Sequence, residues 1–546
     1  MVRPLELCRP SPALIERYRR EGYWIDRTLG AELEAGLIRN AAVPYKVWSD
    51  IRPYEGTMAE IHDCARRLAT SLRELGVGPG DVVSFQLPNW IEAVETFVAT
   101  MFLGAISVPI VQIYGHKELR FVLAQTGAKV HVTTHRFRHL DYRAAIDVMR
   151  ADLPALEHVL YIDDQWDVLV GGEPLASVHE GDPDAPAVIG YTSGTTSDPK
   201  GAIHTSRSTL AEIRQRHCNA IGDDSAVPLN PPKGHDEWLV AAPVAHVSGL
   251  QTAVLLPILL DRRVNLIDRW DVDAVLDVLE RENLSLGAAA NFFFNSVINH
   301  PQFCPKHLRH MQYITSGGSP VPRAFGELCE SMGIKLVRAY GSTEHPTAFG
   351  SAFADPVEKR IGTDGRLVGG VDVELRDFDG NPVPIGTPGE IYTRGPDMFV
   401  GYVDASLNDE AIDADGWFRT GDIGVLDADG YYTITDRAKD IIIRGGENIS
   451  AAEVEDMLAK MPGIVEVAVV AAPDERMGEH VCAFLKLGHG VSEPTMEGIR
   501  AHLASVGLAR QKWPEEIRVI DEFERTASGK IKKFRLREDL RAETTG

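Results

Sequence analysis

A loop rich in glycine and hydroxyl residues, ending in a lysine, is the segment of this sequence best suited to chemistry. It spans residues 191–201 and has the sequence Tyr-Thr-Ser-Gly-Thr-Thr-Ser-Asp-Pro-Lys-Gly. Glycines let backbone N–H groups approach phosphate oxygens, hydroxyls add hydrogen-bond donors, and a lysine supplies a compact positive charge. We therefore expect a polyphosphate, and specifically ATP, to bind here.

The spacing within this loop differs from that of the common P-loop of nucleotide-binding proteins. That motif requires Gly, four residues, and then Gly-Lys followed by Ser or Thr. Five positions after Gly194 stands Pro199, and Gly201 rather than a hydroxyl residue follows Lys200. On composition alone a plain surface loop explains the segment equally well, so the rest of the chain must decide.

The composition is that of an ordinary globular protein with an acidic surface. The chain has 546 residues, of which 44% are hydrophobic and 25% charged, enough for two or three domains. Its formal net charge of -23 argues against a nucleic acid or an anionic membrane as partner, because either would be repelled over most of the exterior. Solubility alone also explains such a charge. An anionic ligand must therefore be met by a locally positive site.

Cysteine spacing and hydropathy predict a cytoplasmic protein without a transmembrane segment. The cysteines show no C-x-x-C spacing, which favours buried free thiols over a disulfide framework or a zinc site. The arginine-rich stretch Met1–Trp24 lacks the apolar core of a signal peptide. The longest apolar run, Phe97–Ile113, is interrupted by Gly104 and Pro109 and is too short for a bilayer. The six cysteines are Cys8, Cys64, Cys218, Cys304, Cys329 and Cys482.

The pattern of apolar runs predicts an α/β fold. Helical stretches alternate with short apolar runs from about residue 55 to 270, which is typical of layered, mostly parallel sheets. Predicted helices are Ser11–Tyr18, Ala59–Leu75, Trp90–Leu103, Ala451–Lys460 and Thr495–Ser505. Predicted strands are Asp81–Leu87, Val108–Val111, Val130–Thr134, Val159–Ile162, Val264–Ile267, Tyr313–Thr315, Lys335–Arg338, Val371–Leu375, Gly389–Thr393, Ile441–Ile443, Val465–Ala472 and His480–Leu487.

A change in the pattern of strands, helices and turn residues along the sequence predicts the domain boundaries. After residue 360, short β runs are separated by Gly, Asp and Pro, and from Lys439 a compact α+β pattern follows. We expect a large N-terminal domain over residues 1–435, with a β-rich subdomain at about 360–435, a boundary at 436–439 and a small C-terminal domain over 440–546. Only Ala542–Gly546 is predicted to be a disordered tail.

Several further motifs, in order along nearly the whole chain, resemble those of one family. This is the superfamily of adenylate-forming enzymes, which includes acyl-CoA synthetases, stand-alone peptide-synthetase adenylation domains and firefly luciferase. The motifs besides the loop are Ser316-Gly317-Gly318-Ser319-Pro320, Tyr340-Gly341-Ser342-Thr343-Glu344, Gly389-Glu390 with Arg394-Gly395, Trp417-Phe418-Arg419-Thr420-Gly421-Asp422, Asp436-Arg437-Ala438-Lys439-Asp440, Gly445-Gly446-Glu447-Asn448 and Ser528-Gly529-Lys530.

The resemblance implies a two-step reaction that uses ATP, Mg²⁺ and coenzyme A. A carboxylate and ATP give an acyl-adenylate and pyrophosphate; a thiol then displaces AMP. Lys530 matches the lysine that stabilises the negative transition state, and Glu344 matches the carboxylate that meets Mg²⁺. His246, within the motif Pro243–Gly249, matches a residue that borders the substrate carboxylate. These three are the predicted catalytic residues.

The same resemblance assigns the nucleotide contacts. Tyr340 would stack on adenine, and Asp422 would accept both ribose hydroxyls. Arg437 would contact the ribose or a phosphate, and Thr196 would join Glu344 at the metal. The full predicted set is Thr192, Ser193, Gly194, Thr195, Thr196, Lys200, Gly318, Ser319, Pro320, Tyr340, Gly341, Ser342, Thr343, Asp422 and Arg437.

The second half-reaction is expected to involve a rotation of the C-terminal domain. Lys439 falls at the hinge position of the family, where a few residues absorb a large backbone change. Lys530 would then leave, and the segment from Lys439 to Gly446 would turn inward. The residues matched to thiolation are Gly445, Gly446 and Glu447.

The acyl pocket is predicted to take a sizeable apolar acid. Gly317 and Gly341 are expected to leave room that larger side chains would fill. No aspartate stands at the start of the segment Val244–Gly249 to pair with an ammonium group, which disfavours an amino-acid substrate. The predicted lining is His246, Val247, Ser248, Phe292, Ser316, Gly317 and Gly341.

Two departures from the family pattern concern the substrate pocket. Ala339 replaces a common glycine, and His345 follows Glu344 where a small or hydroxyl residue is usual.

The N-terminal region looks most like bacterial ligases of cyclohexanecarboxylate and related acids. We therefore expect an acid:CoA ligase acting on an alicyclic, medium-chain fatty, aryl or steroid-derived acid. Loading of a carrier-protein phosphopantetheine is the alternative, and a homodimer is left open. A non-catalytic binding protein is disfavoured because Lys530, Glu344 and Asp422 are all present.

Overall fold

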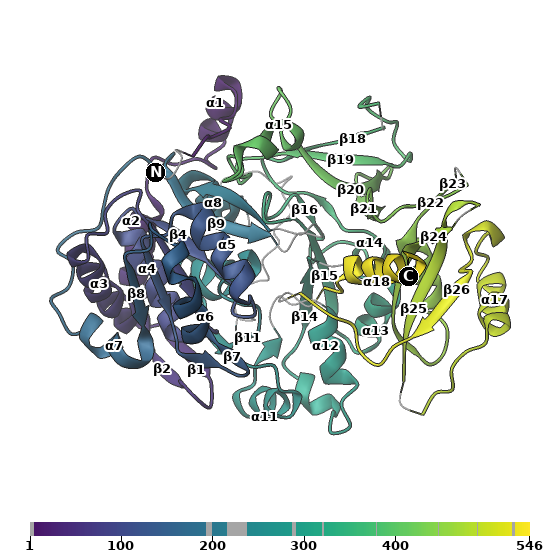
Figure 1. Cartoon of the computed structure of the whole chain (residues 1–546), viewed down its shortest axis with the longest axis horizontal. Coiled ribbons are helices and arrows are strands. Elements are labelled where there is room, and N and C mark those ends of the chain that lie inside the picture. The colour runs from purple at the N-terminus through teal and green to yellow at the C-terminus, as the bar shows by residue number, and fades with distance from the viewer. Residues whose placement is uncertain are drawn as a thin grey trace.

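The computed structural model describes residues 5–192, 199–215, 237–286, 291–318, 321–377, 379–445, 447–474, 476–488, 490–526 and 530–545. Seven predicted site residues lie outside these ranges: Ser193, Gly194, Thr195, Thr196, Ser319, Pro320 and Gly446. Within them the chain folds into layered α/β sheets, an antiparallel sheet and a C-terminal α+β unit, as Figure 1 shows.

A mostly parallel sheet forms the first layer. Its strands follow the order β10-β9-β4-β3-β5-β8, and only the β10–β9 pair among them is antiparallel. The central strand β3 is buried on both faces, as expected for a parallel strand covered by helices. The bounds are β3 (Val82–Gln86), β4 (Ile106–Pro109), β5 (Val130–Thr133), β8 (His158–Tyr161), β9 (Pro186–Thr192) and β10 (Lys200–Thr205).

A second sheet, of order β13-β11-β12-β1-β2, lies in the same large unit. It brings the N-terminal strand β1 beside β12 in a parallel pair, so segments far apart in sequence share one layer. Its bounds are β1 (Pro44–Trp48), β2 (Tyr54–Thr57), β11 (Trp238–Val240), β12 (Val264–Ile267) and β13 (Ser285–Leu286). Helices of this unit include α1 (Pro12–Arg20), α2 (Leu29–Arg39), α3 (Met58–Glu74), α4 (Ile91–Phe102), α5 (His116–Thr126), α6 (Tyr142–Met149), α7 (Ile162–Leu169), α8 (Ser206–Gln215), α10 (Leu256–Leu260) and α11 (Val272–Glu282).

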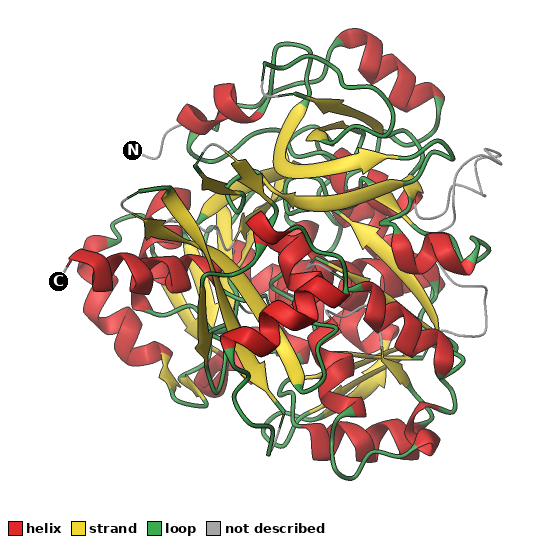
Figure 2. Ribbon diagram, turned by 90° about the vertical axis from the view of Figure 1, so that its right-hand side faces the viewer, coloured by secondary structure: helices red, strands yellow, loops and turns green. Residues whose placement is uncertain are grey.

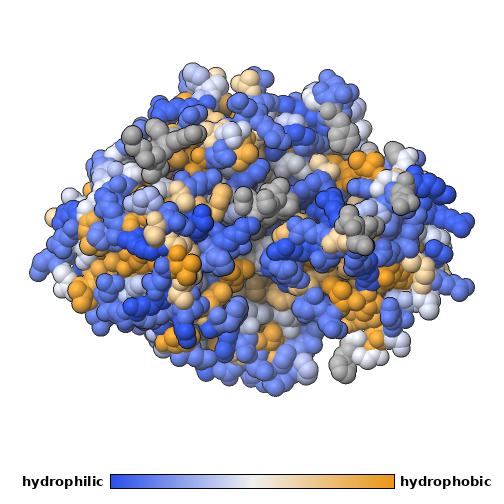
Figure 3. All heavy atoms as spheres, in the orientation of Figure 1, coloured by the Kyte–Doolittle hydropathy of each residue, from blue (hydrophilic) through white to orange (hydrophobic). Residues whose placement is uncertain are grey.

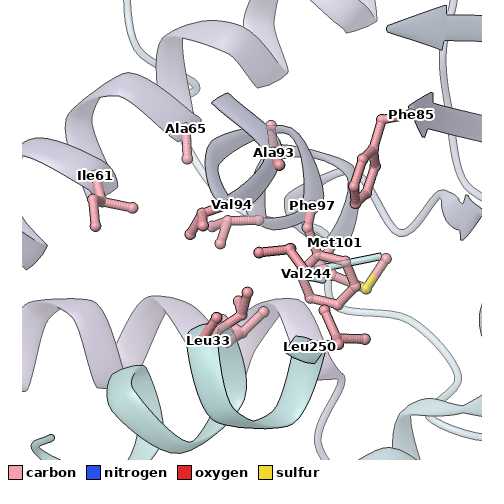
Figure 4. Close-up of a cluster of buried hydrophobic side chains, with 14 of the residues drawn as sticks. Leu33, Ile61, Ala65, Phe85, Ala93, Val94, Phe97, Met101, Val244 and Leu250 are labelled. Carbon is pink, nitrogen blue, oxygen red and sulfur yellow. The ribbon is translucent and has the colours of Figure 1, made fainter. Parts of the chain in front are cut away.

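The main hydrophobic core lies between helices α2, α3 and α4. Leu33 of α2, Ile61 of α3 and Phe97 of α4 are fully buried and point toward one another in Figure 4. Every residue of α4 is buried, because the helix is enclosed by its neighbours instead of lying on the surface. Helices lie against the strands over much of the molecule in Figure 2.

Two further sheets carry most of the motifs after residue 310. The first, β14-β15-β16-β17, begins with a parallel pair, and the second, β18-β19-β20-β21, is antiparallel throughout. The second agrees with the predicted β-rich region, although β21 continues two residues into the predicted boundary. The bounds are β14 (Tyr313–Gly317), β15 (Lys335–Tyr340), β16 (Phe349–Gly350), β17 (Arg366–Leu367), β18 (Asp372–Arg376), β19 (Gly389–Arg394), β20 (Phe418–Leu426) and β21 (Tyr432–Arg437). The helices α13 (Arg323–Ser331), α14 (Val357–Gly362) and α15 (Asn408–Ala411) accompany them.

The C-terminal unit consists of a sheet with helices packed against it. Strands β23-β22-β25-β24 form the sheet, and β26 pairs with β25. The predicted tail is wrong as far as Thr545, because α18 (Lys533–Thr545) continues through it. Burial of Leu540 against the sheet anchors this helix, and its Arg, Ala and Glu residues favour helix formation. Bounds are β22 (Ile442–Arg444), β23 (Glu447–Ile449), β24 (Ile464–Asp474), β25 (Gly478–Leu487), β26 (Glu516–Val519), α16 (Ala451–Leu458) and α17 (Met496–Ser505).

Other predicted elements agree with the structure to within a few residues. The strand expected at Val108–Val111 begins two residues earlier, as β4. Five described cysteines carry free thiols, of which Cys329 and Cys482 are buried. Among the described helices, none combines the length and the apolar character that a bilayer crossing requires. Hydrophilic residues cover much of the face seen in Figure 3.

Helix α2 offers a matched pair of substitutions that tests the core. Leu33 is 0% exposed, whereas Ile38 on the same helix is 59% exposed. Leu33→Ala should lower the free energy of unfolding by about 2–5 kcal/mol, because it leaves a cavity. Ile38→Ala should change it by about 0.5 kcal/mol or less. Urea unfolding followed by circular dichroism measures both, and equal effects would contradict the assigned core.

Candidate active site

The site is built where β14 and β15 end together, next to β20 and β21. Tyr340 is the last residue of β15, while Asp422 and Arg437 are register partners on the two antiparallel strands. The Tyr340 hydroxyl donates to Asp422 Oδ2 at 2.6 Å, and Arg437 Nε donates to Asp422 Oδ1 at 2.5 Å. The fold thus brings three predicted nucleotide contacts together around one buried carboxylate.

Burial and charge keep these partners in their hydrogen-bonding forms. Burial, together with the negative charge of Asp422, raises the pKa of Tyr340 well above its usual value. The Asp422 carboxylate raises the pKa of Arg437. Tyr340 also stacks on Phe349 of β16, with ring centroids 4.5 Å apart. This stack occupies one face of the tyrosine ring.

The predicted phosphate loop begins and ends in a β-hairpin. Thr192 of β9 and Lys200 of β10 are register partners, so the hairpin fixes both ends of the segment between them. The ammonium group of Lys200 lies 5.3 Å from the centroid of the Tyr402 ring, within reach of a cation–π interaction. The ammonium group of Lys200 therefore lies over the ring of this tyrosine.

Tyr402 joins Lys200 to the predicted metal ligand. Its hydroxyl donates to Glu344 Oε1 at 2.7 Å, and the backbone N–H of Phe399 donates to the Glu344 carbonyl oxygen at 2.7 Å. Burial, followed by the charge of Glu344, raises the pKa of Tyr402, which keeps its hydroxyl a donor. Sequence reasoning missed Tyr402, because a tyrosine in a β-rich segment is usually a core residue.

The turn that carries Glu344 is closed by its own side chains. Ser342 Oγ accepts from the backbone N–H groups of Glu344 and His345, each at 3.2 Å. The Ser342 N–H donates to the His345 carbonyl oxygen at 2.8 Å. On the other side, a ring nitrogen of His204 lies 2.7 Å from the Thr343 carbonyl oxygen. These contacts fix the backbone of the turn from which the Glu344 side chain extends.

His345 anchors this turn to the antiparallel sheet. Its ring nitrogens lie 2.8 Å from Thr393 Oγ1 and 3.0 Å from Asp397 Oδ1. Asp397 is fully buried, and the neighbouring imidazole, with hydrogen bonds, holds the pKa of this carboxyl below its usual value despite burial. His345, which departs from the family pattern, thus belongs to a buried contact that anchors the turn carrying Glu344. The sequence signalled it only as an unusual residue type.

The structure gives Gly317 and Gly341 a different role from the one expected. A Cβ atom at Gly317 would overlap the carbonyl oxygen of Ala339, and one at Gly341 would overlap that of Pro346. The space beside both glycines is therefore filled by backbone, and they permit close chain packing. The expectation that they open room for the acid is wrong.

Lys530 reaches this site from the C-terminal unit. Its Cε would lie 4.0 Å from a Cβ atom built on Gly318, the residue that follows β14. Burial and then the positive charge of Arg437 lower its pKa to about 8, although Asp422 and Glu344 act in the opposite direction. A lysine distant in sequence is thus placed among the predicted nucleotide contacts.

His246, a predicted acyl-pocket residue, lies within reach of the charge of Lys530. It caps the short helix α9 (Val247–Gly249), and its Nδ1 lies 3.0 Å from Ser248 Oγ. Burial and then the charge of Lys530 lower the pKa of His246 to about 4, so the imidazole is neutral near pH 7. It can therefore donate or accept a hydrogen bond without carrying charge.

The other predicted acyl residues lie on three elements, α12, β14 and α9. Phe292 belongs to α12 (Asn291–Ile298) and is half-buried, with the guanidinium of Arg525 4.6 Å from its ring centroid. Ser316 of β14 is fully buried, and its hydroxyl has no hydrogen-bond partner among the described residues. Val247 and Ser248 are half-buried in α9.

Of the predicted hinge and thiolation residues, Lys439 lies within electrostatic reach of Arg437 and Asp422, whereas Gly445 and Glu447 belong to the C-terminal unit. Burial and then Arg437 lower the pKa of Lys439 to about 8. The Gly445 N–H donates to the carbonyl oxygen of Met477, within the C-terminal unit. Glu447 is exposed in the β22–β23 hairpin. The structure therefore places Lys530, and not this hairpin, at the site.

These residues fit a metal ion that is held jointly by the protein and by the phosphates of a substrate. No cluster of three or more His, Cys, Asp or Glu side chains suited to a metal occurs in the described ranges. Mg²⁺ is commonly held by one or two carboxylates together with substrate phosphates, so Glu344 alone fits that donor set.

Comparison with known proteins identifies similar chains over almost the whole length. A family model described as AMP-binding enzyme matches residues 44–403, and one described as AMP-binding enzyme C-terminal domain matches residues 453–530. The medium-chain fatty-acid–CoA ligase of Escherichia coli strain K12 is 32% identical over 97% of this chain and 93% of its own length. The indoleacetate–CoA ligase of Aromatoleum aromaticum is 31% identical over 95% of this chain and 98% of its own. The crystal structure of ATP-bound MatB from Rhodopseudomonas palustris is 25% identical, with a TM-score of 0.81 over 93% of this chain and 98% of that one.

The partly buried position of Lys530, within reach of Arg437, predicts an amine whose pKa is lowered. Its labelling by a trace of acetic anhydride, followed by mass spectrometry, should show a midpoint near pH 8. A short lysine peptide labelled in the same tube should titrate near about 10.4. Arg437→Met should move the Lys530 midpoint upward, because it removes a positive neighbour. A Lys530 midpoint equal to that of the peptide would contradict the placement of this lysine.

Proposed function

We propose residue roles and a substrate class for this chain, which belongs to the family of AMP-binding enzymes. It is an AMP-forming acid–thiol ligase that uses ATP, Mg²⁺ and coenzyme A. A carboxylic acid is converted to its acyl-adenylate with release of pyrophosphate, and the acyl group is then transferred to coenzyme A. The acid and the residue roles form the proposal.

The placement of Lys530 carries the proposal. The lysine lies beside Gly318 and within the electrostatic reach of Arg437, Asp422 and Glu344. Attack of a carboxylate oxygen on the α-phosphorus gives a transition state with added negative charge. A preorganised ammonium group stabilises that charge more than the ground state. We assign this role to Lys530.

The nucleoside is proposed to bind around Tyr340 and Asp422. Phe349 covers one ring face of Tyr340, so adenine would use the other. A carboxylate offers about four lone-pair sites, and Tyr340 and Arg437 use one on each oxygen of Asp422. Two sites are left for the ribose hydroxyls without breaking the observed contacts. Gly318, Ser342 and Thr343 are assigned to the same nucleotide.

Glu344 is proposed to supply the protein's oxygen ligand to Mg²⁺. Tyr402 holds Oε1, which leaves Oε2 to face the ion. Mg²⁺, when bound, would neutralise charge on the phosphate oxygens. Lys200, whose ammonium group lies over the Tyr402 ring, would contact the β- and γ-phosphates at the end of its hairpin. Thr196, the other proposed ligand, lies outside the described residues.

The acid is proposed to be a medium-sized apolar carboxylate. His246 is neutral and adjacent to Lys530, so it would donate a hydrogen bond to one carboxylate oxygen while the ammonium group faces the other. Phe292 and Val247 supply apolar surface. The named relatives act on a medium-chain fatty acid and on indoleacetate, which supports an alicyclic, fatty, aryl or steroid-derived acid.

Thioester formation is proposed to require a rearranged C-terminal unit. Residues 1–435 would form the stationary domain, 436–439 the hinge with Lys439, and 440–546 the moving domain. Gly445, Gly446 and Glu447 would then approach the acyl-adenylate as Lys530 leaves. The relatives are CoA ligases, which favours coenzyme A over a carrier protein as acceptor.

The free thiols also fit a reducing compartment, so we propose a cytoplasmic location. Recovery of the protein only in a membrane or secreted fraction would refute this location.

We also propose that the protein can form a homodimer. Sedimentation equilibrium tests this, and a single monomeric mass at micromolar concentration would exclude the homodimer.

Replacing Lys530 should separate the two half-reactions. Lys530→Ala should slow pyrophosphate release about 10²- to 10³-fold, because one charge-stabilising donor is lost. Thioester formation from supplied acyl-adenylate should be unaffected. Lys532→Ala, two residues away, is the matched control and should leave both rates unchanged. Equal loss of both half-reactions in Lys530→Ala would sink the assigned role.

A panel of acids and acceptors tests the substrate class. Pyrophosphate release should be at least about ten-fold faster with octanoate or cyclohexanecarboxylate than with leucine, because the pocket offers no partner for an ammonium group. Product analysis should show the thioester of free coenzyme A. Preference for the amino acid would refute the apolar class, and product only on carrier proteins would refute the acceptor.

A further inference from the structure

Lys530 closes a loop that fixes its position relative to Arg525. Arg525 and Ile531 form an antiparallel bridge. The Thr526 N–H donates to the Lys530 carbonyl oxygen at 2.8 Å, and the Lys530 N–H donates to Thr526 Oγ1 at 3.1 Å. A displacement of Arg525 must therefore be felt at Lys530.

Arg525 also touches the large unit directly. Its guanidinium lies 4.6 Å from the ring centroid of Phe292, and its side chain is 14% exposed. A planar guanidinium over an aromatic ring gains both cation–π and stacking energy, and partial burial strengthens it. This contact joins the loop of Lys530 to a wall of the predicted acyl pocket.

Both sides of the contact are braced. Phe292 packs edge-on against Phe293 at 5.5 Å, and Phe293 packs against Trp270 at 4.7 Å. Trp270 Nε1 in turn donates to Ser296 Oγ at 2.8 Å. On the other side, Arg525 donates to Glu466 of β24 and is thereby fixed to the C-terminal sheet. These contacts hold both the Phe292 ring and the Arg525 guanidinium in place.

We propose that Arg525 is a positioning residue, which seats Lys530 for adenylation by laying its guanidinium on Phe292. This rests on the proposed role of Lys530 in that half-reaction. Because the contact joins the loop of Lys530 to the large unit, it stabilises the arrangement in which Lys530 lies at Gly318. Its loss should therefore slow adenylation and spare thioester formation.

The test combines substitutions on both sides of the contact. Arg525→Met and Phe292→Leu should each slow pyrophosphate release about ten-fold, because a partly buried cation–π contact is lost. Arg525→Met, which changes no residue of the predicted acyl pocket, should leave thioester formation from supplied acyl-adenylate within about two-fold of the parent rate. The double variant should be no slower than either single one, since both remove the same interaction. Arg525→Lys should recover part of the rate, because an ammonium group also binds an aromatic face.

Two controls separate positioning from a structural role and from failure of the proposed function. Glu466→Gln removes the ion pair within the C-terminal unit but keeps the guanidinium on the ring, so it should slow adenylation much less than Arg525→Met. Labelling of Lys530 needs no catalysis, and its midpoint should rise from near pH 8 in both Arg525→Met and Phe292→Leu. If Arg525→Met unfolds at a lower temperature, the Lys530 labelling midpoint of Phe292→Leu carries the test from the opposite side.

Additive effects in the double variant would overturn the proposal. Parallel loss of both half-reactions, or an effect of Glu466→Gln as large as that of Arg525→Met, would do the same. If the parent enzyme releases no pyrophosphate with any acid, the proposed function is refuted. In that case the labelling experiment still tests the positioning role, and an unchanged Lys530 midpoint in both Arg525→Met and Phe292→Leu would overturn it.

Discussion

The arrangement depends on bringing two positive side chains, Lys530 and Arg437, into one partly buried site. Burial and the charge of Arg437 both act against the ammonium form of Lys530, and the carboxylates of Asp422 and Glu344 offset this only in part. Such a site is most stable when an anion enters it, because the anion relieves the repulsion. A chain with a net charge of -23 thus presents a local positive site to a phosphate.

The sheets hold the charged groups by backbone packing. Because β14 and β15 pair in parallel, their carboxyl ends lie side by side. Gly317 and Gly341 let neighbouring backbone carbonyl groups come close. The Glu344 turn is fixed by Ser342 in front and by the buried His345–Asp397 contact behind. Lys530 is the exception, because it comes from the C-terminal unit. Under the proposed function that unit rearranges between the half-reactions, so this one residue would decide which of them proceeds.

Sequence reasoning predicted those parts of the fold and site that local pattern determines. The strand Val264–Ile267 was predicted with its observed bounds, because a short apolar run between polar residues has few other solutions. The helical ending of the chain was missed, since burial of Leu540 depends on a sheet formed far away. Tyr402 could not be found from its own neighbours, and the space beside Gly317 and Gly341 depends on backbone that pairs only in the folded state. The identities of the charged residues came from a resemblance, and only the fold shows which of them meet.

Isotope transfer from the acid tests the central claim most directly. Octanoate labelled with ¹⁸O on both carboxylate oxygens would be incubated with the enzyme, ATP, Mg²⁺ and coenzyme A, and the products examined by mass spectrometry. Attack on the α-phosphorus followed by thiolysis predicts one ¹⁸O atom in AMP, one in the thioester carbonyl and none in pyrophosphate. Label in phosphate or pyrophosphate, or AMP without label, would contradict the account.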